Sequence, residues 1–315
     1  MTRYQKGIET IVKHCLGVKK GELAIVVCDK PKRPIGTDLF DALVAAGAES
    51  LLCEMTPRSQ HSEEPPEYIA ELLSSADVFL VPTSKSMTHT RARTNAVRNG
   101  ARGATLPDVT QDMIARTMSA DCNDIHKRTE KLSRILKGAK KIRITTRKGT
   151  DVEIVTAGRD FCLDTGVLTK PGSFSNLPAG EIYVAPVEGK SSGLVVFDAS
   201  FSGLGMLSEP ITIEIDKGRA LKIKGDRGRL ARMLDAPGPN GRNLAELGIG
   251  TNDKARITGY VLEDEKVMGT IHLAFGDNAN FGGKVKVDVH LDGMVTRPTV
   301  EADGKVIMKD GHLIL

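Results

Sequence analysis

The chain has 315 residues, of which 40% are hydrophobic and 27% charged, with a formal net charge of +4. This length predicts roughly two domains with ordinary cores. The lack of tryptophan and the low aromatic content argue against an aromatic platform for nucleic acid. No apolar run is long enough for a membrane span. The five cysteines form no CxxC pair and indicate a reduced, cytoplasmic protein.

The first part of the chain alternates strand and helix patterns. Strands are expected at 22–29, 50–55, 77–83 and 103–107, and helices at 37–50, 65–76, 91–100 and 108–118. Thr37 or Asp38 is the expected N-cap of the first of these helices. Repeated βα units of this kind predict a parallel sheet with helices on its faces, a Rossmann-like arrangement. We therefore expect an α/β domain over residues 1–139, closed by a helix at 123–136.

After about residue 140 the pattern changes to alternating strands. One hairpin is expected around Lys148-Gly149 and a second, over 211–226, turns at Lys217-Gly218. Residues 295–315 are expected to form short strands that turn at Asp303-Gly304 and Asp310-Gly311. We predict a mostly β, α+β metal-binding domain over residues 140–315.

Two of the seven histidines lie in apolar, glycine-punctuated segments of this second domain. His290 and Asp292 are two residues apart in a segment that alternates like a strand, so both side chains project from one face. His272 precedes them in another strand pattern, and a short glycine-rich connection can make the two strands neighbours. Two imidazoles and one carboxylate are a minimal ligand set for Zn²⁺, Mn²⁺, Co²⁺ or non-haem Fe²⁺.

Three glutamates extend this candidate site. Glu181 follows a Pro-x-Gly turn at the mouth of a strand, and Glu246 lies beside an apolar, glycine-rich strand. A carboxylate in such a place is costly unless it has a partner. Glu265 lies seven residues before His272, a spacing that puts both on one face only if the segment is helical.

A second polar cluster follows the strand expected at 77–83. Ligands of open α/β sheets bind at such strand-to-helix junctions, and a helix N-terminus there favours a carboxylate or phosphate. The expected substrate-binding residues are Ser84, Thr88, His89 and Arg91. No GxGxxG or Walker loop is present, so a nucleotide cofactor is not expected.

At these segments the sequence resembles the aminopeptidase T (thermophilic leucyl aminopeptidase) metallopeptidase family. The resemblance covers residues 176–186, the Glu246 strand, Glu265 with the His272 strand and the His290-x-Asp292 pair, and it extends to residues 88–102. It implies a two-metal centre on Glu181, Glu246, Glu265, His272, His290 and Asp292, and a homodimer. The same superfamily resembles 2,5-dihydroxypyridine 5,6-dioxygenase, which implies one Fe²⁺ on His272, His290 and Asp292.

Three hypotheses follow. The first is an aminopeptidase-like hydrolase for small peptides, in which two Zn²⁺, Co²⁺ or Mn²⁺ ions activate a water, with Glu246 as the bridge and Glu181 or Glu246 as the proton shuttle. The second is a mononuclear Fe²⁺ dioxygenase that cleaves the ring of a small dihydroxypyridine-like substrate, with Glu181 as acid or base. The third is a metal-binding relative with altered catalysis. None of them requires nucleic acid or a membrane.

Overall fold

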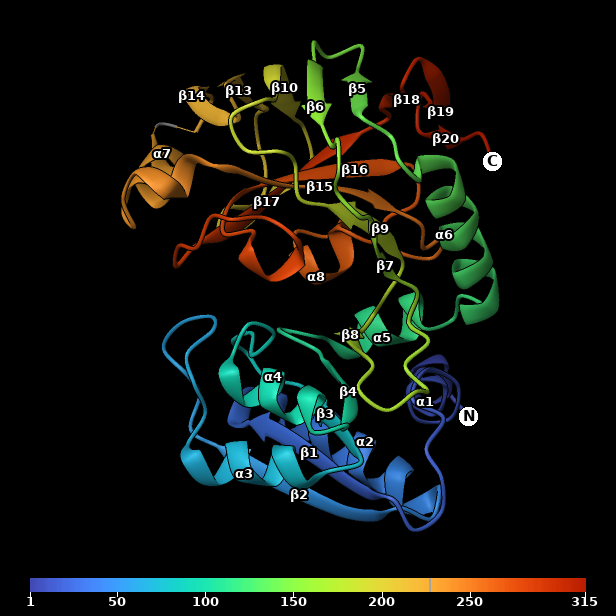
Figure 1. The fold of residues 1–315 in the computed structure, drawn as a ribbon. Helices are drawn as coiled ribbons and strands as arrows, with labels where there is room; N and C mark the ends of the chain where they lie inside the picture. The colour runs from blue at the N-terminus through green and yellow to red at the C-terminus, as the bar shows by residue number, and fades with distance from the viewer. Residues whose placement is uncertain (227) are drawn as a thin grey trace. The chain divides into compact units, whose positions relative to one another are not determined.

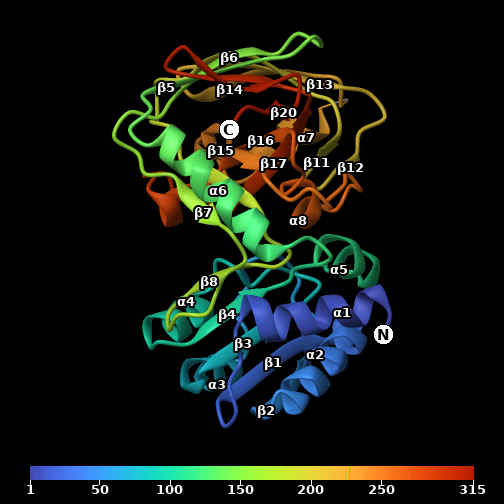
Figure 2. The ribbon, with the colours of Figure 1, turned by 90° about the vertical axis from the view of Figure 1, so that its right-hand side faces the viewer.

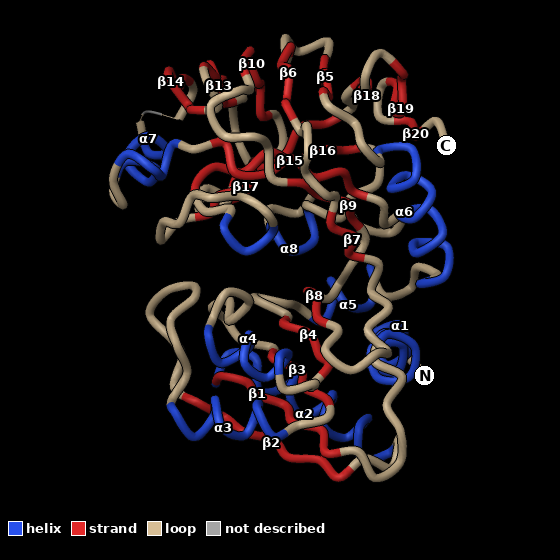
Figure 3. Tube along the Cα trace, viewed as in Figure 1, coloured by secondary structure: helices blue, strands red, loops and turns tan. Residues whose placement is uncertain are grey.

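The computed structural model describes residues 1–226 and 228–315. The chain divides into two compact units: unit 1 comprises Met1–His126 with Asp164–Ala179, and unit 2 comprises Lys127–Leu163 with Gly180–Leu315. Helices are concentrated in the N-terminal part and strands in the C-terminal part (Figure 3). Within the described part of the chain, no helix has the length and apolar character needed to cross a membrane.

Unit 1 is built on a five-stranded parallel sheet in the order β2-β1-β3-β4-β8 (Figure 1). The strands are β1 (Leu23–Asp29), β2 (Glu49–Met55), β3 (Val78–Val81), β4 (Arg102–Thr105) and β8 (Phe174–Asn176). The strand order reverses between β1 and β3, as in doubly wound folds. The parallel α/β sheet expected from the sequence is therefore confirmed.

Helices cover both faces of this sheet (Figures 1 and 2). They are α1 (Arg3–Glu9), α2 (Arg33–Ala45), α3 (Glu67–Ser75), α4 (Arg91–Arg98) and α5 (Gln111–Thr117). The apolar strands explain this arrangement, because alternate side chains of one strand point to opposite faces. Ile25 and Val27 of β1 pack with Leu73 of α3, whereas Cys28 approaches Gly36 of α2. A sheet that is apolar on both faces needs two helical layers.

Unit 2 contains two sheets that enclose one hydrophobic core. The first has the order β14-β13-β10-β6-β5-β18-β19-β20, with β5 (Lys141–Thr145), β6 (Asp151–Val155), β10 (Ser192–Phe197), β13 (Ile211–Asp216), β14 (Arg219–Lys224), β18 (Thr299–Ala302), β19 (Lys305–Lys309) and β20 (His312–Leu313). The second has the order β12-β11-β17-β16-β15-β9-β7, with β7 (Cys162–Asp164), β9 (Glu181–Val184), β11 (Ser200–Phe201), β12 (Gly205–Met206), β15 (Leu244–Gly250), β16 (Thr270–Gly276) and β17 (His290–Thr296). Helices α6 (Cys122–Leu136) and α7 (Arg229–Asp235) contribute leucines to the core.

The hairpins expected in unit 2 are confirmed. Strands β5 and β6 pair around Lys148-Gly149, and β13 and β14 pair around Lys217-Gly218. Lys217, Asp303 and Asp310 have positive φ, as do the glycines that follow them. Two consecutive residues with positive φ match the twist of the flanking strands, so the local sequence determines where these strands turn.

Three features differ from the sequence expectation. Helix α2 begins at Arg33 after a 3-10 turn at Lys30–Lys32, rather than at Thr37 or Asp38. Pro34 in its first turn suits this start, since its fixed φ matches a helix and its missing N–H is not needed there. The segment that alternates before His290 and Asp292 forms a strand only from His290, where β17 begins. Before it, the N–H groups of Val285 and Val287 donate to the side chains of Asn278 and Asp277 instead of to a neighbouring strand. Strand β8, from the middle of the chain, completes the sheet of unit 1.

Candidate metal centre

Four neighbouring antiparallel strands of unit 2, in the order β9-β15-β16-β17, form the floor of the candidate site. Each alternates between a core face and a site face. On the core face lie Ile182, Val184, Leu247, Ile249, Ile271, Leu273, Phe275 and Val295. The side chains between them therefore point to the other face, which carries Glu181, Glu246, His272, His290 and Asp292.

Strand pairing explains why residues distant in sequence come together. Asp292 pairs with Ala274, and His290 pairs with Gly276. His272 pairs with Gly248 on one side and Met294 on the other. Between the polar residues the site face thus carries Gly248, Ala274 and Met294, and the His272 ring lies over Gly248.

Gly248 is required by the position of His272. A Cβ added at Gly248 would lie 2.1 Å from both Cε1 and Nε2 of His272. The His272 imidazole therefore occupies the position where any other residue would carry a side chain. This glycine, which no sequence pattern indicated, fixes the position of a candidate metal ligand.

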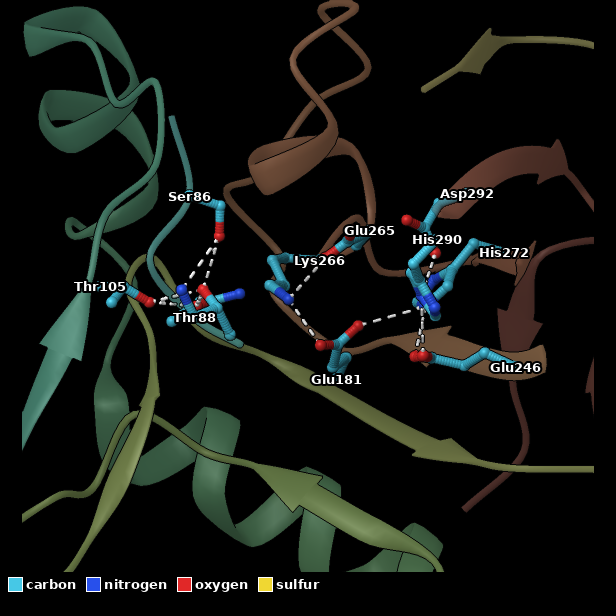
Figure 4. A network of polar contacts seen from close by, with 11 residues as sticks. Ser86, Thr88, Thr105, Glu181, Glu246, Glu265, Lys266, His272, His290 and Asp292 are labelled. Carbon is cyan, nitrogen blue, oxygen red and sulfur yellow. Dashed lines mark hydrogen bonds and ion pairs between the residues drawn. The ribbon is translucent and has the colours of Figure 1, made fainter. Parts of the chain in front are cut away.

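The carboxylate of Glu246 contacts both imidazoles (Figure 4). Its Oε1 is 3.3 Å from Nε2 of His272, and its Oε2 is 3.3 Å from Nε2 of His290. Nε2 of His290 is also 3.4 Å from Oδ1 of Asp292, and Nε2 of His272 is 3.4 Å from Oε2 of Glu181. Five of the six side chains expected from the sequence are thus brought together.

These atoms form two triads with metal-ligand spacing that share Glu246. One consists of Glu181, Glu246 and His272, the other of Glu246, His290 and Asp292, and within each triad the ligand atoms lie within 4.8 Å of one another. Four of the five residues are buried, and His290 is partly exposed.

Glu265 reaches the site indirectly. It follows the short helix α8 (Val261–Asp264) and lies before β16, so the helical spacing that would align it with His272 does not occur. Its Oε2 is 3.0 Å from Nζ of Lys266, and the same Nζ is 2.5 Å from Oε1 of Glu181. The fully buried Lys266 was not predicted, because a lysine beside an acidic turn is typical of a protein surface.

The carboxylates determine the charge state of the imidazoles. Burial lowers the pKa of His272, but the hydrogen bond with Glu246 and the charges of Glu181 and Glu246 raise it to about 9. Burial also opposes charge on His290, yet Asp292 and Glu246 raise its pKa well above the usual value. Burial tends to raise the pKa of Glu246, whereas hydrogen bonds from both histidines hold it well below its usual range. The site therefore favours positive charge strongly.

The donor set fits a divalent cation. Four carboxylates, those of Glu181, Glu246, Glu265 and Asp292, surround one ammonium group and two imidazoles. With neutral imidazoles the cluster has an excess of three negative charges, which a bound divalent ion would reduce to one. Imidazole and carboxylate together suit Zn²⁺, Fe²⁺, Mn²⁺ or Co²⁺. This cluster therefore supports metal binding.

This charge balance predicts a pH dependence. The folded-state pKa of His272, about 9, lies above the value near 6.5 of an unfolded chain. The stabilisation of the metal-free protein by the protonated imidazole is complete below pH about 6.5 and is lost as the pH rises through 9. A metal ion needs neutral imidazoles, so its affinity should rise over the same window, with proton release. Calorimetric titration at pH 7.5 in two buffers of different ionisation enthalpy should detect one to two released protons per ion; equal heats in both buffers would contradict this.

The substrate-binding residues expected from the sequence separate into different environments of unit 1. Thr88 belongs to a hydroxyl cluster at the carboxyl ends of β4 and β8 (Figure 4). Its Oγ1 is 2.8 Å from Oγ1 of Thr105 and donates to Oδ1 of Asn176 at 2.9 Å, and it accepts from Ser86 at 2.9 Å. Thr105 and Asn176 were not predicted, because β8 was not.

Ser84 lies at the strand-order reversal, where its backbone N–H and its hydroxyl both donate to the buried carboxylate of Asp29. Arg91 is exposed and pairs with Glu64 at 3.4 Å. His89 is also exposed. Of the four expected residues, Ser84 and Thr88 therefore lie at the carboxyl edge of the sheet in built polar networks, while the other two lie at the surface of unit 1.

An aromatic group borders the candidate metal ligands. The ring of Phe281 lies edge-on to that of His290, with centroids 6.0 Å apart, and edge-on to Tyr183 at 5.5 Å. Tyr183 shares the site face with Glu181, since the two are two residues apart on β9. Tyr183 was not predicted, although its spacing of two residues from Glu181 in a strand would have placed it on the same face.

Comparison with known proteins decides the family. A family model described as 2,5-dihydroxypyridine 5,6-dioxygenase (NicX) matches residues 6–315. The chain belongs to this family. Among curated proteins, it is 23% identical over 260 residues to the 2,5-dihydroxypyridine 5,6-dioxygenase of Pseudomonas putida (strain KT2440), covering 77% of this chain and 72% of that protein. It is 27% identical over 185 residues to aminopeptidase T of Thermus thermophilus, covering 52% of this chain and 44% of that protein.

Solved structures give the same ranking of the two relatives. The 2,5-dihydroxypyridine dioxygenase of Pseudomonas putida KT2440 matches with a TM-score of 0.86 at 18% identity, over 100% of this chain and 98% of that one. Wild-type AmpT from Thermus thermophilus matches with a TM-score of 0.74 at 16% identity, over 99% of each chain. The two likenesses show a shared fold. Together with the family match, they place this chain with the dioxygenases and make aminopeptidase T the more distant relative, which reverses the order expected from the sequence.

Proposed function

We propose that this protein is a metal-dependent dioxygenase that opens the ring of a dihydroxypyridine-like substrate. The family match over nearly the whole chain carries this proposal. The convergence of two imidazoles and buried carboxylates on one sheet face supports it, because such a donor set leaves open positions on a ferrous ion for oxygen and a diol. His272, His290 and Asp292 are the proposed ligands.

A ferrous ion held by His272, His290 and Asp292 would supply the activation of O₂ next to the substrate ring. Both oxygen atoms of O₂ enter the product of a dioxygenase reaction, so no external reductant is needed. Glu181 and Glu246 lie beside His272 at 3.4 and 3.3 Å, where either carboxylate can accept a proton from a ring hydroxyl.

The proposal is tested by oxygen uptake. Protein reconstituted anaerobically with Fe²⁺ should consume one O₂ for each 2,5-dihydroxypyridine lost, and the ring absorbance should disappear at the same rate. Protein loaded with Zn²⁺ has no accessible redox change and should be inactive, which makes it the matched control. Loss of ring absorbance without oxygen uptake, or no turnover with bound Fe²⁺, would contradict the proposal.

One observation keeps an aminopeptidase reading as a second candidate. The two oxygens of Glu246 face different triads, as expected for a carboxylate that bridges two metal ions. Under this reading, protein loaded with Zn²⁺, Co²⁺ or Mn²⁺ should release the chromophore from Leu-p-nitroanilide. Absence of hydrolysis with all three ions would eliminate it.

A further inference from the structure

Lys266 is a buried cation that neither proposed reaction uses. Its side chain is fully buried, whereas lysines are almost never buried without a partner. The long side chain loses hydration and conformational freedom in such a place. Its partners are the carboxylates of Glu181 and Glu265, at 2.5 and 3.0 Å from Nζ.

The backbone around Lys266 is held in place from several sides. Its N–H donates to the carbonyl of Glu263 at 2.9 Å, and its own carbonyl accepts from the N–H of Asn252 at 2.8 Å. A Cβ at Gly250 would lie 2.1 Å from the carbonyl oxygen of Val267, so a bare backbone at Gly250 lets this turn approach β15. The ammonium group is therefore positioned by the fold rather than by its charged partners alone.

The position of the ammonium affects one of the two metal triads. Glu181 belongs to the triad with Glu246 and His272, and Oε1 of Glu181 is the atom that Lys266 contacts. A divalent ion in this triad would lie close to a like charge in a poorly hydrated environment, where Coulomb repulsion is strong. To bind there, the ion would have to weaken the Glu181–Lys266 pair and leave a buried ammonium poorly compensated.

We propose that Lys266 takes the place of a second metal ion, so that the centre holds one divalent ion per chain. The ammonium compensates Glu181 and Glu265, and the single ion is held by the proposed ligands His272, His290 and Asp292. Lys266 is thus a positioning residue that sets metal stoichiometry. The inference rests on the metal centre of the proposed function, but it concerns the number of ions rather than the reaction.

Counting metal ions tests this directly. Metal-free protein is reconstituted with excess Mn²⁺, freed of unbound ion, and analysed for manganese per chain by mass spectrometry. Wild-type protein should hold one ion, and Lys266→Met, which keeps the length of the side chain but removes its charge, should hold two. Lys254→Met is the matched control, because Lys254 is half exposed and pairs with Asp253; it should hold one.

Electron paramagnetic resonance gives a second readout. One isolated Mn²⁺ gives a six-line spectrum, whereas two ions bridged by Glu246 give an exchange-coupled spectrum, expected only for Lys266→Met. If circular dichroism shows that Lys266→Met is not properly folded, Lys266→Gln is used in its place. Glu181→Gln in the wild-type background should leave the count at one.

Each outcome has one meaning. Two ions per wild-type chain, one ion in both neutral variants, or a loss of the ion in Glu181→Gln overturns the inference. One ion in wild-type protein and two in a neutral variant supports it. A protein that holds one ion but consumes no oxygen contradicts the proposed reaction and leaves the role of Lys266 intact, whereas a wild-type chain that binds no divalent ion contradicts both.

Discussion

Replacing His290 by alanine should lower the affinity for the divalent ion more than about 100-fold and abolish turnover. Nε2 of His290 lies 3.3 Å from Glu246 and 3.4 Å from Asp292. The substitution therefore removes the nitrogen ligand that lies next to both carboxylates. Loss of partners outside the ligand shell already costs about 10–100-fold in affinity or activity, and loss of a ligand should cost more. Titration of metal-free protein by calorimetry, with oxygen uptake on the same samples, measures both effects.

His312→Ala is the matched control for this prediction. His312 is exposed in β20, and its Nδ1 lies 3.1 Å from the backbone carbonyl of Asp310, so its removal should leave metal affinity and turnover within twofold of wild type. His290 is partly exposed, and its replacement should leave the fold intact by circular dichroism. Unchanged metal affinity in a folded His290→Ala protein would show that the assigned centre is wrong.

Gly248→Ala should disable the centre although glycine itself binds nothing. The added methyl group would lie 2.1 Å from the His272 ring, far inside van der Waals contact. The imidazole must therefore leave its position beside Glu246. Forcing an extra carbon into a packed site costs about 1–3 kcal/mol of stability. We expect a fall in the free energy of unfolding of this size and a loss of metal affinity comparable with that of His272→Ala, measured by denaturant unfolding and calorimetry.

A double-mutant cycle separates the clash from any other effect of the alanine. In the His272→Ala background the ring is absent, so Gly248→Ala should cost much less stability there than in wild-type protein. An equal cost in both backgrounds would show that Gly248 is needed for a reason unrelated to His272.

Much of the candidate site follows from short-range sequence patterns. The period of two in a strand places His290 with Asp292 on one face, and the apolar neighbours of His272 send that residue to the same face of the sheet. A short glycine-rich connection made β16 and β17 neighbours, as the pairing of Gly276 with His290 confirms. These inferences succeeded because strand alternation and tight connections are local properties.

The remaining features depend on contacts between distant segments. Lys266 meets Glu181 across 85 positions in the sequence, and no local pattern indicates that a lysine in an acidic turn will be buried. Thr105 meets Asn176 only because β8 joins the sheet of unit 1. The N-cap of α2 was placed at Thr37 or Asp38, five or six residues after the observed Lys32, since a hydroxyl or carboxyl N-cap was preferred over the proline at Pro34.

The return of residues 164–179 to the first unit has a consequence for how the protein can be made and divided. When the ribosome has released only the first 126 residues, β4 has no neighbour on one side, because β8 is still to be synthesised. Its unpaired backbone groups are then a template for association with other chains. A fragment that ends at His126 should therefore aggregate or dimerise, whereas one in which residues 164–179 are joined by a short linker should be monomeric. Truncating the gene at a single codon therefore cannot separate the two units, because each unit consists of two segments of the chain.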